Sequence, residues 1–76
     1  MARDTPNRSL AEIIGDRLHE ARLEAGYTQH AFAKIMGCTV TTVSRWETGR
    51  VIPPVMTLQR VANELDVTLA SLVEEE

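Results

Sequence analysis

Residues 29–48 read QHAFAKIMGCTVTTVSRWET, and this stretch decides the fold. Apolar or small residues recur at helical spacing on both sides of Gly37, at Ala31, Phe32, Ala33, Ile35 and Met36 and then at Val40, Val43 and Trp46. Gly37 allows a tight turn, because a glycine adopts the left-handed backbone conformation without a steric penalty. The pattern predicts two short helices, about Gln29–Met36 and about Val40–Thr48, which cross at a large angle. The small Ala33 lets them approach closely.

The flanking sequence adds three predicted helices. Ser9 and Glu12 have the spacing of a capping box, which starts a helix over about Leu10–Ala25. Two more helices are predicted over about Val55–Leu65 and about Leu69–Val73. Apolar stripes that face inward are predicted at Leu10, Ile13, Ile14, Leu18 and Ala21, and at Leu58, Val61, Ala62 and Leu65. The sequence therefore predicts an all-α bundle of five helices.

The predicted organisation is one domain over residues 9–73, with an N-terminal arm at residues 1–8 and an acidic tail at residues 74–76. The arm has two interpretations. It is a flexible start, or it places Arg3 and Arg8 on DNA phosphates or in the minor groove.

The overall charge limits which partners fit. The net charge is −3, from 8 basic and 11 acidic residues, and this argues against a strong nonspecific binder of polyanions. The last three residues, all glutamate, supply the whole excess, so nucleic-acid binding would need a local basic face. No apolar run approaches the roughly 18 residues that span a bilayer. The start, MARDTPNRS, has no apolar core, and a lone Cys38 cannot form an internal disulfide. Together these features favour the cytoplasm.

The stretch 29–48 and its flanks resemble the helix-turn-helix of the phage repressor/Cro (xenobiotic-response-element) family. The resemblance covers Ile13 to Leu72 and includes RLEAGYTQ before the motif, RWETG at its end and PPVMTLQRVANELDVTLASL behind it. It implies a lambda-repressor-like DNA-binding domain whose second motif helix lies in the major groove of double-stranded DNA.

The outer face of that second helix carries short hydroxyls, one valine and a single long basic side chain. The candidate base-reading residues are Thr39, Val40, Thr41, Ser44 and Arg45. Arg45 suits guanine, because a guanidinium can donate to both O6 and N7, while Val40 or the Thr41 methyl suits a thymine methyl. In the family, the matching positions of Thr39, Val40, Thr41 and Arg45 are the usual base readers. An ordinary solvated helix face is the alternative.

A second group of residues is expected to hold the DNA backbone. Gln29 is the first residue of its helix. Its backbone N–H and its side-chain amide therefore face whatever group lies at the positive end of that helix. In related repressors this glutamine holds a phosphate, and the positions of Thr48 and Arg50 touch phosphate from the far side. The Thr42 hydroxyl is a further phosphate donor, as is the Thr39 hydroxyl. His30 adds a phosphate contact or is simply solvated.

Arg22 and Glu47 match an arginine and a glutamate that the family commonly pairs. We expect a structural, partly buried ion pair that fixes the first helix against the recognition helix. Trp46 is expected in or near the core, and base stacking is the alternative.

No enzyme activity, cofactor or metal is expected. His19 and His30 lie eleven residues apart and no cluster of cysteines or carboxylates has ligand spacing. Cys38 has no histidine placed by sequence to activate it.

One recognition helix with one strong base reader is too little for a specific site, where each good contact contributes about 1–3 kcal/mol. We therefore expect a homodimer whose recognition helices lie about 34 Å apart. The expected interface consists of Val51, Ile52, Val55, Val67, Leu69 and Val73, unless these residues simply close the core.

The principal hypothesis is a homodimeric transcriptional regulator, a repressor or autoregulator, on a palindromic operator. The alternative is an antitoxin that binds a toxin and also autoregulates its promoter. A third reading is a scaffold of the same fold without DNA binding. The sequence leaves open a protein partner such as a toxin or RNA polymerase.

Overall fold

The computed structural model describes residues 8–74, and this part of the chain holds five helices and no strand. The helices are α1 (Leu10–Glu24), α2 (Gln29–Met36), α3 (Val40–Glu47), α4 (Val55–Leu65) and α5 (Leu69–Val73). The predicted all-α fold is confirmed. Two helices end one residue earlier than predicted, because Ala25 and Thr48 are C-caps.

Local signals in the sequence start most of these helices. The Ser9 hydroxyl accepts the Glu12 N–H at 3.1 Å, and the Glu12 side chain accepts the Ser9 N–H at 3.2 Å, so the capping box of α1 forms. The hydroxyls of Thr28, Thr39 and Thr68 cap α2, α3 and α5 in the same way. Pro54 precedes α4 and provides no side-chain cap.

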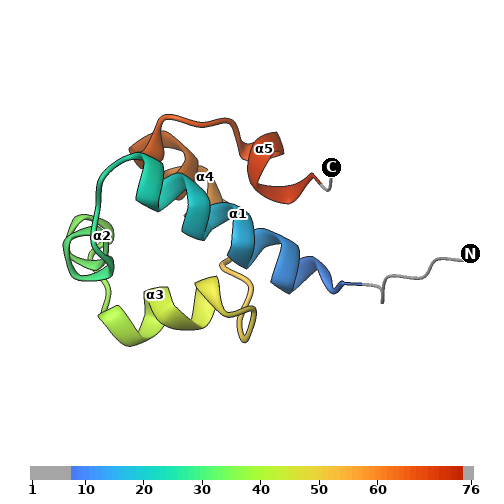
Figure 1. The fold of residues 1–76 in the computed structure, drawn as a ribbon, viewed down its shortest axis with the longest axis horizontal. Coiled ribbons are helices and arrows are strands. Elements are labelled where there is room, and N and C mark those ends of the chain that lie inside the picture. Colours follow the sequence, from blue (N-terminus) through green and yellow to red (C-terminus); the bar gives the residue numbers. More distant parts are fainter. Residues whose placement is uncertain (1–7, 75–76) are drawn as a thin grey trace, which may run out of the picture.

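Helix α1 runs through the middle of the bundle (Figure 1). It packs against α3 on one side and against α4 and α5 on the other, while α2 packs against α3. The turn between α2 and α3 contains Gly37 with φ of 75°, the left-handed conformation that its lack of a Cβ permits. The two motif helices therefore stand at an angle, and α3 occupies an outer edge of the molecule.

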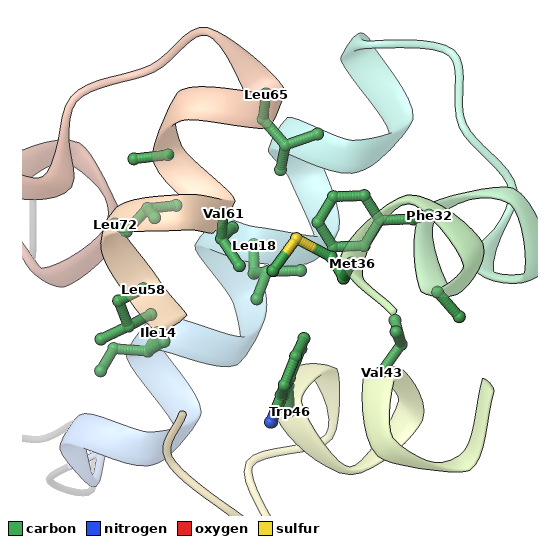
Figure 2. Close-up of a cluster of buried hydrophobic side chains, with 12 residues drawn as sticks. Ile14, Leu18, Phe32, Met36, Val43, Trp46, Leu58, Val61, Leu65 and Leu72 are labelled. Carbon is green, nitrogen blue, oxygen red and sulfur yellow. The ribbon is translucent and has the colours of Figure 1, made fainter. Parts of the chain in front are cut away.

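All five helices contribute to one hydrophobic core (Figure 2). Its buried residues are Ile14, Leu18, Phe32, Ala33, Met36, Val43, Trp46, Leu58, Val61, Ala62, Leu65 and Leu72. Trp46 is 6% exposed, in agreement with its predicted place in the core. Burial of this apolar surface is the main force that holds α3 against α1 and α2.

Helices α1 and α3 approach each other closely at Gly15, which is buried. A Cβ on this residue would lie 2.6 Å from the Trp46 carbonyl oxygen and 2.7 Å from that of Glu47. No real Cβ sits so close to backbone oxygens, so only glycine fits between these helices. No pattern in the sequence predicts this role of Gly15.

The predicted inward stripe of α1 is wrong at its first residue. Leu10 is 52% exposed, and Ala21 is only partly buried. Helix α1 has 15 residues and α3 has 8, lengths of roughly 22 and 12 Å at 1.5 Å per residue. The first turn of α1 therefore extends beyond the helices that could cover it, as the ribbon shows (Figure 1).

The predicted arm lies almost wholly outside the described residues, which begin at Arg8. The Arg8 guanidinium forms an ion pair with Asp16 and donates to the Glu12 carbonyl oxygen at 3.3 Å. Arg8 thus has partners on α1. Residues 1–7, and with them Arg3, are not described.

Candidate nucleic-acid interface

Helix α3 divides its residues between two faces. Val43, Trp46 and Glu47 point into the bundle and are buried. Thr41 and Arg45 lie on the opposite face and are exposed, while Val40 and Ser44 beside them are partly exposed. The face that was predicted to read bases is therefore accessible.

A shallow hollow of about 410 Å³ runs along this outer face. It is lined by Gln29, Val40, Thr41, Ser44, Arg45, Thr48 and Arg50. The structure thus brings four predicted base readers together with three predicted phosphate-binding residues, although they come from α2, α3 and the segment after α3. A single elongated ligand that lies in this hollow could contact all seven residues.

The charge of the hollow matches a polyanion. Its seven lining residues include two arginines and no carboxylate. Neither the Arg45 nor the Arg50 guanidinium has a hydrogen bond or ion pair with another residue of the range 8–74. Both positive charges are therefore available to a ligand.

A second hollow, of about 530 Å³, has the opposite character. Arg8, Glu12, Asp16, Glu47 and Thr48 line it, so three of its five residues are acidic. Thr48 borders both hollows. An acidic surface disfavours a polyanion, so the contrast favours the side with Arg45 and Arg50 for such a ligand.

Three predicted contact residues lie outside the basic hollow. His30 and Thr39 are exposed, and Thr42 is partly buried. The Thr39 and Thr42 hydroxyl oxygens are 3.1 Å apart and share a hydrogen bond, while Thr39 also accepts the Thr42 backbone N–H. These two hydroxyls therefore already serve the start of α3, and a phosphate would have to share them.

Arg22 and Glu47 meet where α1 crosses α3. Arg22 donates from Nε to Glu47 Oε2 at 2.6 Å and from Nη2 to Oε1 at 3.1 Å, and its Nη1 donates to the Tyr27 carbonyl oxygen at 2.7 Å. Both residues are buried. The two residues that the sequence analysis paired are thus joined by two hydrogen bonds, and the pair ties α3 to α1 and to the loop before α2.

Two further side chains donate to Glu47, and neither contact was predicted from the sequence. His19 Nδ1 and Gln29 Nε2 lie 2.9 and 3.0 Å from Glu47 Oε1. Glu47 follows His19 by 28 residues, so no local pattern could reveal this contact. The one local relationship is that His19 and Arg22, three residues apart on α1, share a face of that helix. Gln29, the expected phosphate clamp, is therefore held in place by the ion pair.

These donors keep Glu47 ionised. Burial raises the pKa of the Glu47 carboxyl, but hydrogen bonds from Arg22, His19 and Gln29, together with the Arg22 charge, outweigh it and leave the pKa below its usual value. The carboxylate is thus a permanent acceptor near neutral pH.

The six residues that were predicted to form a dimer interface fall into two groups. Val51, Ile52 and Val55 are 44%, 44% and 65% exposed, and the neighbouring Met56 is 80% exposed. We call these four residues the 51–56 patch. The other three, Val67, Leu69 and Val73, are partly buried and pack against the core. Only the first group presents a large apolar surface.

Other kinds of site have little support in the described residues. Within residues 8–74, no group of three histidine, cysteine or acidic side chains could hold a metal ion. Burial raises the pKa of the Cys38 thiol, although the Arg60 charge opposes this shift. No helix in the described part of the chain is long and apolar enough to cross a membrane.

Comparisons with known proteins agree with this geometry. A family model described as "Helix-turn-helix" matches residues 18–72. The uncharacterized HTH-type transcriptional regulator YazB of Bacillus subtilis (strain 168) is 35% identical over 66 residues, which are 87% of this chain and 96% of YazB. The SPbeta prophage-derived uncharacterized HTH-type transcriptional regulator YonR of the same organism is 31% identical over 62 residues, 82% of this chain and 57% of YonR.

The fold is also similar to that of solved structures. The crystal structure of the clp gene regulator ClgR from C. glutamicum has a TM-score of 0.84 with this chain at 24% identity. The match covers 92% of this chain and 90% of ClgR.

Proposed function

We propose that this chain, which belongs to the helix-turn-helix family of DNA-binding transcriptional regulators, acts in the cytoplasm as a homodimeric repressor on a two-fold symmetric operator. The observation that carries the proposal is the basic hollow, where Gln29, the outer face of α3 and Arg50 form one surface. The outer face of α3 then enters the major groove, with Arg45 as the main base reader.

The division of roles follows from position and chemistry. Val40, Thr41 and Ser44 stand beside Arg45 on α3 and offer a methyl surface and hydroxyls to the base edges. Gln29 and Arg50 border the same hollow from outside α3, so they grip the DNA backbone on its two sides. Thr48 sits between them, although its hydroxyl already donates to the Ser44 carbonyl oxygen at 2.8 Å.

A dimer is proposed because one copy reads too few bases. A second copy doubles the base contacts and places two recognition helices about 34 Å apart, on successive major grooves. The exposed 51–56 patch supports self-association through the segment between α3 and α4 and the start of α4. A dimer bound to an operator that overlaps a promoter would exclude RNA polymerase, and this represses transcription without a second protein partner.

Selection of bound duplexes from a random pool tests the proposal directly. The expected result is an enriched site with two inverted half-sites whose centres lie about 10 base pairs, one helical turn, apart. Size exclusion with light scattering on the same complex should give two chains per duplex. Failure to enrich any sequence, or a complex with one chain per duplex, would contradict the proposal.

A further inference from the structure

The new inference concerns what the buried ion pair does for the residue that is expected to hold a phosphate. Gln29 is partly buried and belongs to the lining of the basic hollow. Its Nε2 donates to Glu47 Oε1 at 3.0 Å. Glu47 does not line that hollow, and its side chain is 3% exposed. Gln29 therefore connects the surface of the hollow to a buried carboxylate on α3.

The contact fixes how the Gln29 amide is turned. An ionised carboxylate accepts hydrogen bonds and cannot donate them, so the amide nitrogen, and not the amide oxygen, must face Glu47. This nitrogen carries two hydrogens whose N–H bonds diverge, so the second N–H is directed away from the carboxylate. Within residues 8–74 the second N–H has no hydrogen-bond partner. It is an oriented donor that is still free, and phosphate oxygens accept hydrogen bonds.

The carboxylate that orients Gln29 is itself held in place. Arg22 donates to both of its oxygens, from Nε to Oε2 at 2.6 Å and from Nη2 to Oε1 at 3.1 Å. The Arg22 side chain is 6% exposed, so water has little access to this pair. The Arg22 charge balances that of Glu47, and the pair as a whole therefore adds no net repulsion to a phosphate at Gln29.

We propose that Arg22 and Glu47 are positioning residues for DNA binding, which hold the Gln29 amide with its free N–H ready for a backbone phosphate before DNA arrives. The inference rests on the proposed function, because it requires a phosphate at Gln29. A side chain that is ordered in advance loses less rotamer freedom on binding, and this raises the affinity. Neither Arg22 nor Glu47 contacts the DNA. Since Glu47 lies on α3, the same contact keeps the phosphate-binding amide in register with the base readers.

A double-mutant cycle separates this role from structural support alone. Arg22→Met/Glu47→Leu removes one positive and one negative charge, so the net charge of the chain does not change. This variant and the wild type are each compared with and without Gln29→Ala. The affinities of the four proteins are measured for the selected operator and for an unrelated duplex of the same length, about 20 base pairs. Urea unfolding establishes that each protein is folded under the binding conditions.

With Gln29 present, Arg22→Met/Glu47→Leu should bind both duplexes roughly two- to tenfold more weakly, which is the effect of ordering one flexible side chain on binding. The factor should be the same for both duplexes, because a phosphate contact carries no sequence information. In the Gln29→Ala background, loss of the ion pair should leave both affinities unchanged. An equal loss with and without Gln29, or no loss in either background, would overturn the inference.

A measurement on the unaltered chain tests the inference even if the double variant fails to fold. The chain has two glutamines, and the second, Gln59, is exposed and donates to Asn63 on the surface of α4 at 3.1 Å. In the free protein, nitrogen relaxation by NMR should show the Gln29 side-chain amide as ordered as the backbone and more ordered than that of Gln59. Gln29→Ala identifies the resonances.

The outcomes of this measurement separate the inference from the proposed function. A Gln29 amide as mobile as that of Gln59 in the free protein would overturn the inference and leave the proposed function intact. Absence of wild-type binding to any duplex at low salt would instead contradict the proposed function itself.

Discussion

Gly15 of α1 and Trp46 of α3 approach so closely that a Cβ on the glycine would lie 2.6 Å from the tryptophan carbonyl oxygen. Helix α3 thus lies directly against the backbone of α1.

Gly15→Ala should destabilise the domain. Alanine gains about 1 kcal/mol over glycine inside a helix. We expect a net loss of at least about 1 kcal/mol in the free energy of unfolding, because two backbone carbonyls must move to admit the methyl group. Denaturant unfolding measures this, with Glu20→Ala on the exposed side of α1 as the control. A Gly15→Ala protein as stable as the wild type would show that α1 and α3 can move apart without a loss of stability.

Glu47→Ala should cost roughly 3–5 kcal/mol, because it leaves the buried Arg22 charge without its carboxylate. The double variant Arg22→Met/Glu47→Leu should recover most of that stability, since no buried charge remains. The difference between the single and double variants in urea unfolding is the measurement. If the single and the double variant were equally unstable, the loss of the ion pair itself, and not the unpaired Arg22 charge, would explain the lower stability.

The stability of the domain should fall in acid partly through Glu47. Its pKa is lower in the folded protein than in an unfolded chain, so the contribution of Glu47 is complete above the ordinary glutamate value of about 4.3. It is lost as the pH drops below that value and through the folded pKa. Melting temperatures across this range should fall more steeply for the wild type than for Arg22→Met/Glu47→Leu. Parallel curves would assign the acid sensitivity to other carboxyl groups.

Arg45→Ala and Arg50→Ala should affect DNA binding differently. Loss of Arg45 should cost about 1–3 kcal/mol on the selected operator and relax the preference at one base pair. Loss of Arg50 should weaken binding to all duplexes alike and reduce the salt dependence, because one phosphate contact is gone. Both side chains are exposed, so folding should be unchanged. If the two variants lost the same affinity on every DNA sequence, the assignment of Arg45 to base reading and Arg50 to phosphate binding would be wrong.

Val55→Glu should disrupt the proposed dimer without unfolding the chain, because this side chain is 65% exposed. Leu23→Glu is the matched control, since Leu23 is a similarly exposed apolar residue, at 55%, outside the 51–56 patch. Light scattering should give a monomer for Val55→Glu, and its operator affinity should fall well below that of Leu23→Glu. Equal association of the two variants would place the dimer contact elsewhere.

The sequence predicted features whose signals are local. Ser9 and Glu12 form their capping box, and Gly37 turns the chain as expected, because each depends on a few adjacent residues. Leu10 was placed inside because periodicity describes one face of a helix but not the length of its neighbours. The role of Gly15 was invisible, since a glycine within a helix has no signal of its own until the crossing of α1 and α3 is known.

The candidate site was predictable to a similar degree. The pairing of Arg22 with Glu47 came from the family resemblance, and the structure places the two side chains in contact. The contacts of His19 and Gln29 with the same carboxylate depend on how three helices meet, so no spacing along the chain could have indicated them.

The two-sided construction of α3 has a practical consequence. Its inner residues are buried against the rest of the protein, whereas Thr41 and Arg45 are exposed and do not belong to the core. Substituting the outward set should retarget the protein to new DNA sequences at little expense in foldability. The exposed residues of α3 can thus be exchanged as a set, while its buried residues keep the helix in place.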